Sequence, residues 1–307
     1  MTAPLKRPDP FSRNHLIRDA IGQALYDAMK EDPAIHLFGE GAEIKMHYDA
    51  PQIEKEMADR VHTLPISEDG NVNFCVGASL LGVKPVCDII TADFLYRCMD
   101  SICNTAAKLN FVQAEGEPAK TIVVRAEFLT GGPTTGQRPE FLFARIPGLN
   151  VVVPSTPKDA YGLMRQALVT RGVTLFFEDR MIRDGEFKAP DLASGWAFTK
   201  PLLGPRPLDG EAIFRSSAGG RRLTIVAYGL MRQVVESVLN ESGLENVGLI
   251  DLATLYPLDM DTIAASVKMT GQILVVEPDI WFGGIGAEII AQLHELLGGA
   301  FNAKRLG

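Results

Sequence analysis

Short apolar runs alternate with stretches of helical periodicity along most of this 307-residue chain, and this alternation limits the folds that it can adopt. Between residues 14 and 30, apolar side chains such as Leu16 and Leu25 recur on one face of a helix. The runs at 34–38 and 121–125 are short and mostly apolar or β-branched, which is typical of parallel strands covered on both faces. The pattern predicts an α/β fold with doubly wound sheets.

The alternation is interrupted over residues 184–220, which are rich in proline and glycine and lack apolar periodicity. A chain of 307 residues is long enough for two hydrophobic cores, so we interpret the interruption as a connection between domains. We therefore expect a flexible arm over 1–13, a larger α/β domain over 14–183, the interdomain connection, and a smaller α/β domain over 221–307. Within the larger domain, the spacing of apolar residues predicts one long helix over 94–114.

Composition and charge exclude several classes of function. A net charge of −8 argues against a nucleic-acid-binding surface, and no apolar run is long enough to span a membrane. The N-terminus lacks the apolar core of a secretory signal, and the 4 cysteines form no Cys-x-x-Cys pair, so we expect free thiols in a reducing cytoplasm. The 5 histidines show no metal-ligand spacing, so we expect no metal site in this chain. Complete glycine motifs for dinucleotides, nucleoside triphosphates or a hydrolase nucleophile are also absent.

The stretch 64–82 carries the most informative polar residues. Glu68 and Asp69 follow a short approach segment, and Gly70 precedes an apolar stripe with helical spacing that begins at Val72. Glu68 is therefore expected at or just before a helix N-terminus, where the helix dipole favours a carboxylate. On this spacing alone, the acidic pair either caps a buried helix or places a carboxyl group in a cofactor site.

Motifs along the whole chain occur in an order that identifies a family. They include Leu37-Phe-Gly-Glu40, Pro65-Ile-Ser-Glu68, Val76-Gly-Ala-Ser-Leu-Leu-Gly82, Thr91-Ala-Asp-Phe94, Ile146-Pro-Gly-Leu149, Leu252-Ala-Thr-Leu-Tyr-Pro257 and Val276-Glu-Pro278. In this order, the chain resembles the beta subunit of the thiamine-diphosphate-dependent decarboxylase component of 2-oxoacid dehydrogenase complexes, of the pyruvate dehydrogenase type. The resemblance implies a larger transketolase-like pyrimidine-binding domain followed by a smaller transketolase C-terminal-type domain.

The resemblance also implies roles for individual residues. Glu68 matches the family glutamate that contacts the aminopyrimidine ring of thiamine diphosphate, and it is the expected catalytic residue. Phe94 matches an aromatic residue that packs on the same ring, although an ordinary core aromatic would also fit that position. Glu40 and Ile66 are further expected cofactor-binding residues, and a capping or turn role is the alternative for Glu40.

One familiar element of thiamine enzymes is missing from this sequence. Such enzymes hold the diphosphate through Mg²⁺ with a Gly-Asp-Gly motif, and no Gly-Asp-Gly occurs here. We therefore expect an alpha-type partner subunit to hold the Mg²⁺ and the diphosphate, in an α2β2 heterotetramer with each cofactor at an α–β interface. A lipoyl or acyl-carrier domain is the expected acyl acceptor.

The loop at 129–139 departs from the family in a second way. Thr135 occupies the position where the family carries a catalytic histidine, and no histidine lies nearby in the sequence. Threonine cannot shuttle a proton near neutral pH as imidazole can. Thr135, Gln137 in the same loop, and His47 are the candidate substrate residues, and His47 or a partner's histidine is a possible replacement acid or base.

Three functions are compatible with these observations. The first is a beta-type subunit of an enzyme that decarboxylates a 2-oxoacid and transfers the acyl unit to a lipoyl or carrier group. The second is a transketolase-like transfer of a two-carbon unit from a ketose phosphate to a carrier protein or aldose, because Gly132-Pro-Thr-Thr135 is similar to a transketolase loop. The third is a non-catalytic interaction subunit, against which the retained Glu68 and Phe94 argue.

Overall fold

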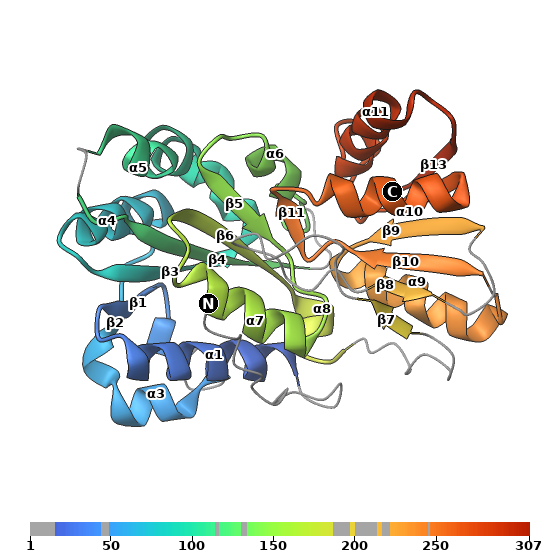
Figure 1. The fold of residues 1–307 in the computed structure, drawn as a ribbon. Coiled ribbons are helices and arrows are strands. Elements are labelled where there is room, and N and C mark those ends of the chain that lie inside the picture. Colours follow the sequence, from blue (N-terminus) through green and yellow to red (C-terminus); the bar gives the residue numbers. More distant parts are fainter. Residues whose placement is uncertain are drawn as a thin grey trace, which may run out of the picture.

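The computed structural model places two α/β units side by side, each with helices packed against its sheet (Figure 1). The expected arm at 1–13 and the candidate residue His47 lie outside the described residues. The structure describes 16–43, 49–113, 117–129, 134–186, 222–244 and 246–307, together with the backbone of 197–199 and 214–216.

The larger unit is built on a seven-stranded sheet with the strand order β11-β5-β6-β4-β3-β1-β2. All neighbouring strands are parallel except β11, which runs antiparallel to β5. The strands are β1 (Ile35–Gly39), β2 (Val61–Thr63), β3 (Lys84–Thr91), β4 (Thr121–Phe128), β5 (Leu149–Val152), β6 (Gly172–Asp179) and β11 (Thr254–Tyr256).

Helices cover both faces of this sheet, as the apolar runs predict (Figure 1). On β4, Ile122 and Val124 enter the core beneath α4, whereas Val123 enters the core shared with α1. The doubly wound arrangement is therefore confirmed for the larger unit. The helices are α1 (Ile17–Glu31), α3 (Pro51–Glu56), η1 (Ala58–Arg60), α4 (Glu68–Leu80), α6 (Glu140–Ala144), α7 (Pro157–Ala167) and α8 (Arg180–Arg183).

The segment predicted as one long helix over 94–114 is helical from Ala92 to Val112, but it is not one regular α-helix. The chain instead forms a series of short turns, in which tight 3₁₀ and wide π segments alternate. The polar side chain of Ser101 binds the carboxylate of Asp69 on α4, and Asn73 Nδ2 donates to Ser101 Oγ at 2.6 Å. These contacts anchor the π turn against α4 and outweigh the apolar periodicity. The segments are η2 (Ala92–Cys98), η3 (Ser101–Thr105), η4 (Ala106–Lys108) and α5 (Leu109–Val112).

The smaller unit has a six-stranded sheet with the order β13-β12-β9-β10-β8-β7. Its last two strands come from 184–220, the range expected to serve only as a connection, and both run antiparallel to their neighbours. Strands of three residues are too short to produce a recognisable apolar pattern. The elements are β7 (Ala197–Thr199), β8 (Phe214–Ser216), β9 (Leu223–Ala227), α9 (Gly229–Ser242), β10 (Val247–Asp251), α10 (Met260–Thr270), β12 (Gln272–Val276), α11 (Ile285–Leu297) and β13 (Asn302–Leu306).

The two units are joined by buried polar contacts as well as by β11. Ser155 Oγ donates to Asp251 Oδ1 at 2.8 Å, and Tyr228 Oη donates to Glu140 Oε1 at 3.0 Å. Across the part of the chain that the structure describes, no helix has the length and apolar character needed to cross a membrane. All 4 cysteines are free thiols, as the sequence predicts.

Candidate active site

Glu68 is the first residue of α4, which confirms its predicted place at a helix N-terminus. Its side chain is almost fully buried, with a relative exposure of 7%. The unpaired N–H groups and the positive end of the helix dipole lie at this end of α4 and stabilise a negative charge there. The position therefore suits a carboxyl group that must stay close to the protein interior.

Glu40 lies beside Glu68 because it contacts Ser67, the residue directly before Glu68. Glu40 and Ser67 are 27 positions apart in the chain. Its Oε1 accepts a hydrogen bond from the backbone N–H of Ser67 at 3.0 Å. The preceding Gly39 packs closely against Asp88 on β3, because a Cβ there would lie 2.5 Å from the carbonyl oxygen of Asp88. Burial raises the pKa of Glu40, and the negative charges of Glu68 and Asp88 add to the rise against the Ser67 hydrogen bond. The structure thus forms a carboxyl pair at the carboxyl end of β1.

The η2 segment places an aromatic and a cationic side chain near this pair. Arg97 Nε lies 3.5 Å from Glu68 Oε2, but the Arg97 side chain is 73% exposed. Phe94, one 3₁₀ turn earlier, is 36% exposed, and Ile66 just before α4 is 83% exposed. A buried carboxyl group is therefore bordered by apolar side chains that remain open to a ligand or a partner. Sequence reasoning did not identify Arg97, whose three-residue spacing from Phe94 is the signal that could have found it.

Asp93 anchors the loop that carries Thr135 and Gln137. Its carboxylate accepts hydrogen bonds from the backbone N–H of Gln137 at 3.0 Å and of Gly136 at 3.1 Å, and from Thr91 Oγ1 at 3.0 Å. Burial alone would raise the pKa of Asp93, but these three donors hold it below its ordinary value. Because Asp93 precedes Phe94, this contact fixes the loop next to η2. Both predicted loop residues are therefore held near the segment that carries Phe94.

A second group of charges lies behind the carboxyl pair and is fully buried. Arg125 on β4 contacts Glu178 Oε1 at 2.7 Å through Nε, Asp49 Oδ2 at 3.2 Å through Nη2, and Asp88 Oδ2 at 3.8 Å through Nη1. The Arg125 side chain is only 1% exposed. Arg183 supplies a second cation, 3.5 Å from Asp49 Oδ1 and 3.7 Å from Glu178 Oε2, so this buried group, named here the Arg125 cluster, pairs its carboxylates internally.

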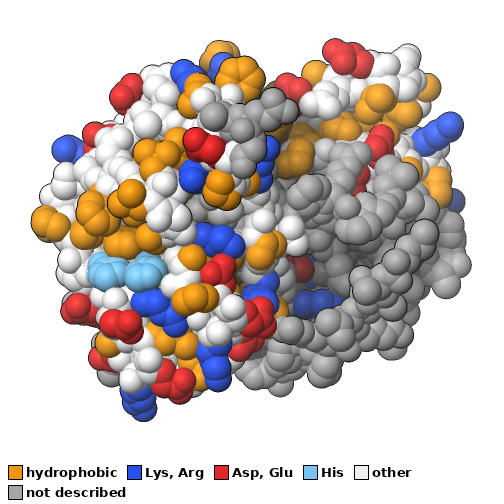
Figure 2. Space-filling model, turned by 60° about the vertical axis from the view of Figure 1, so that its left-hand side comes forward, with side chains coloured by type: hydrophobic (Ala, Val, Ile, Leu, Met, Phe, Trp, Pro, Cys, Tyr) orange, Lys and Arg blue, Asp and Glu red, His pale blue; other side chains and the backbone are white. Residues whose placement is uncertain are grey.

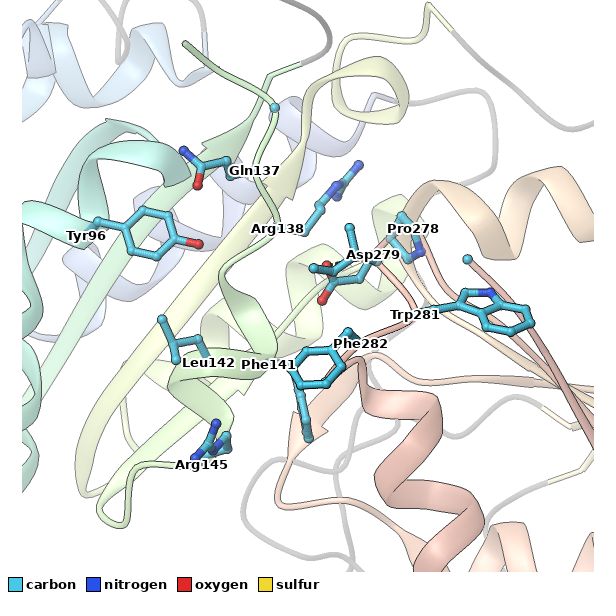
Figure 3. A pocket seen from close by; sticks show the side chains of 14 residues that line it. Tyr96, Gln137, Arg138, Phe141, Leu142, Arg145, Pro278, Asp279, Trp281 and Phe282 are labelled. Atoms are coloured by element: carbon cyan, nitrogen blue, oxygen red, sulfur yellow. Dashed lines mark hydrogen bonds between the residues drawn. The ribbon is translucent and has the colours of Figure 1, made fainter. Parts of the chain in front are cut away.

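The two units also enclose a cleft of about 980 Å³, which we call the interdomain cleft (Figure 3). Gln137 and Tyr96 line it from the larger unit, and Asp279, Trp281 and Phe282 line it from the smaller one. Sequence reasoning missed this cleft apart from Gln137, because its walls come from segments that lie far apart in the chain.

Comparison with known proteins assigns each of the two units to a known domain family. The family described as "Transketolase, pyrimidine binding domain" matches residues 15–183, and that described as "Transketolase, C-terminal domain" matches residues 210–307. A split gene transketolase, solved as an inactive beta4 tetramer, has the same fold with a TM-score of 0.73 at 20% identity, over 95% of this chain and 88% of that one.

Curated relatives narrow the family further. The beta subunit of acetoin:2,6-dichlorophenolindophenol oxidoreductase from Cupriavidus necator is 32% identical over 95% of this chain and 88% of its own length. The beta subunit of 2-oxoisovalerate dehydrogenase from Pseudomonas aeruginosa is 33% identical over 79% of this chain and 71% of its own length. The mitochondrial beta subunit of the pyruvate dehydrogenase E1 component from Caenorhabditis elegans is 31% identical, with coverages of 91% and 79%. With both domains matched in order, this chain belongs to the transketolase-like family of 2-oxoacid dehydrogenase beta subunits.

Proposed function

We propose that this chain is the beta-type subunit of a thiamine-diphosphate-dependent enzyme that decarboxylates a 2-oxoacid and transfers the acyl unit to a lipoyl or carrier group. The observation that supports this proposal best is the Glu68 carboxyl group, which is buried at the start of α4 beside Glu40 and next to open apolar side chains. A helix cap alone would not require a second carboxyl group so close by.

The side chains around Glu68 fit the pyrimidine half of the cofactor. A flat ring with polar nitrogens needs a hydrogen-bonding carboxyl group at its edge and an apolar surface at its face. Glu68 provides the first, and the exposed surfaces of Phe94 and Ile66 provide the second. When bound, thiamine diphosphate supplies the carbon nucleophile and the electron sink for decarboxylation.

The protein's own part of the chemistry is positioning and proton control. Glu68 would bond the ring edge and keep the pyrimidine in the orientation that supports proton removal. Burial and the neighbouring charges raise the pKa of Glu40, so protonation of this carboxyl group costs less than it would for a carboxyl group in water. Arg97 compensates the Glu68 charge from the solvent side.

An alpha-type partner is part of the proposal. Hydrophobic side chains gather on the face that carries α4, beside histidine side chains (Figure 2). Exposed apolar side chains on and around α4 include Ile66 before its first turn, Phe74 within it at 53% exposure and Leu81 after its last residue at 88% exposure. Open apolar surface of this kind marks an interaction site.

Within the described ranges, no group of three or more His, Cys, Asp or Glu side chains is arranged to hold a metal ion. We propose that the partner holds the Mg²⁺ and the diphosphate in an α2β2 assembly, and that the enzyme is cytoplasmic.

Transfer of a two-carbon unit from a ketose phosphate remains a second candidate, because Thr135 replaces the family histidine in the loop that Asp93 anchors. Co-expression with an alpha-type partner carrying Gly-Asp-Gly separates the two reactions. The purified complex is supplied with thiamine diphosphate, Mg²⁺ and either a panel of 2-oxoacids or a ketose phosphate. We expect carbon dioxide release from a 2-oxoacid, whereas cleavage of the ketose phosphate without any carbon dioxide release would favour the second candidate.

A further inference from the structure

The interdomain cleft is large and is continued by a second hollow. Its volume of about 980 Å³ lies at the upper end of the range for small-molecule pockets. A neighbouring hollow of about 400 Å³ shares two of its lining residues, Phe141 and Arg145. These two residues therefore stand at the junction of the two spaces, Phe141 within α6 and Arg145 directly after it.

The wall from the smaller unit is apolar, exposed and anchored. Ile280, Trp281 and Phe282 are 69%, 60% and 91% exposed, although large apolar side chains are rarely exposed together without a function. Arg305 on β13 holds this wall, because its Nη1 donates to the carbonyl oxygen of Trp281 at 3.0 Å and its guanidinium lies 5.7 Å from the indole centroid. The aromatic surface is thus pre-positioned rather than collapsed onto the core.

The two arginines that line the cleft differ in whether a carboxylate of the protein already pairs with them. Arg138 is largely buried and already paired, because its Nη2 lies 2.9 Å from Asp179 Oδ2 and its guanidinium lies 4.1 Å from the Phe128 ring centroid, although its Nη1 has no hydrogen-bond partner among the described residues. Arg145 is exposed and has no carboxylate within ion-pair distance in the described part of the chain. Asp279 lies on the opposite wall, where burial raises the pKa of its carboxyl group and Arg138 opposes the rise. Arg145 is therefore the cation that the cleft can offer to a ligand.

We propose that the interdomain cleft binds an aromatic carboxylate, with its ring against Phe141, Trp281 and Phe282 and its carboxylate on Arg145. In the view of Figure 3, Phe141 and Phe282 lie between Arg145 and Trp281, and all four residues line the same cleft. Aromatic rings favour a flat partner through stacked or edge-to-face contacts, and a guanidinium binds a carboxylate with two parallel hydrogen bonds. The cleft borders the loop of Gln137 and the η2 segment, but the proposed binding does not depend on the proposed reaction.

Calorimetric titration of the full chain with 3-phenylpropionate and with its neutral amide tests this proposal. We expect saturable binding of the carboxylate and a weakening by about tenfold in Arg145→Gln, with little change for the amide. Phe282→Ser should weaken both probes, since it removes part of the shared aromatic wall. Arg222→Gln, at an exposed arginine outside the cleft, is the matched control and should change neither.

Two outcomes would overturn the proposal. One is the absence of saturable binding for either probe. The other is binding of the carboxylate that Arg145→Gln and Phe282→Ser leave unchanged, which would place the ligand elsewhere. Both substituted side chains are exposed, and the thermal unfolding midpoint of each variant checks that it folds as the parent does.

Discussion

The carboxyl pair of Glu40 and Glu68 and the carboxylates of the Arg125 cluster lie at the same edge of one sheet, yet their surroundings differ. In the Arg125 cluster, a guanidinium that is 1% exposed lies within 3.8 Å of all three carboxylates. Glu68 has one cation at 3.5 Å on a side chain that is 73% exposed, and Glu40 has none within ion-pair distance in the described residues. Charges that compensate one another inside the core serve stability, whereas an incompletely compensated carboxyl pair beside open apolar surface is suited to a ligand.

The largest effect on function should come from Glu68→Gln. This change keeps the size of the side chain and removes its ability to ionise, so we expect turnover of the assembled enzyme to fall by about 10²–10⁴-fold. Assembly and the unfolding midpoint should stay unchanged. Steady-state kinetics of carbon dioxide release measures the effect, with Glu295→Gln on the exposed face of α11 as the matched control. Full activity of Glu68→Gln would remove this residue from the mechanism.

The largest effect on stability should come from Arg125→Met, which removes the more deeply buried of the two cations that pair with Asp49 and Glu178, the other being Arg183. Breaking a buried ion pair in this way costs about 3–5 kcal/mol in the free energy of unfolding. Urea unfolding of the chain provides the measurement. Arg180→Met, at a half-exposed arginine 3.8 Å from Asp184, should cost less than about 1 kcal/mol. If both variants lost the same small amount, the contrast between the two charge groups would not hold.

Glu140 extends the comparison to a buried carboxyl group that has no cation within ion-pair distance in the described chain. Burial raises its pKa from the ordinary 4.5 to about 7, although Arg138 and Tyr228 oppose the shift. The folded state therefore binds more protons than the unfolded state between these values, so this group lowers stability as pH rises from about 4.5 to about 7, by about 3 kcal/mol.

Urea unfolding of Glu140→Gln at a series of pH values measures this contribution. The variant should be more stable than the parent at pH 8, and its stability should depend less steeply on pH. Some slope should remain, because burial also raises the pKa of Asp251 to about 7. Parallel pH curves for variant and parent would contradict the assignment.

The smallest expected effect is that of Phe94→Ala. Phe94 is 36% exposed, so its removal should change the unfolding free energy little. Loss of the aromatic contact should weaken binding of thiamine diphosphate to the assembled enzyme by about tenfold. Equilibrium titration of the cofactor checks this, and Phe111→Ala, at an aromatic residue that is 90% exposed on α5, is the control. Equal affinities for both variants would show that Phe94 does not contact the cofactor.

The fold was predictable wherever one element buries one regular face. The helix α1 and the strands β4 and β6 follow directly from apolar periodicity, because their burial depends on local pattern. The series of turns from Ala92 to Val112 was not predictable, since contacts between Ser101 and α4 arise only in the folded chain. The same is true of β11, which leaves its own unit to pair with β5.

The candidate site likewise contains some residues that the sequence predicts and others that only the structure identifies. Glu68 and Glu40 could be predicted from motif order, and the structure brings them together through Ser67. Their roles, and those of Ile66, Phe94, Thr135 and Gln137, stay predictions. Arg97 and the anchoring by Asp93 required the three-dimensional structure, because their partners lie far away in the sequence.

The central claim is that Glu68 belongs to half of a thiamine diphosphate site, which another subunit completes. The most direct test is a calorimetric titration of thiamine diphosphate with Mg²⁺ into this chain alone and into its complex with an alpha-type partner. We expect saturable binding in the complex and none for the chain alone at the same concentrations, and we expect Glu68→Gln to weaken thiamine diphosphate binding by the complex without changing its assembly. Equal affinity of the isolated chain and the complex would contradict the claim.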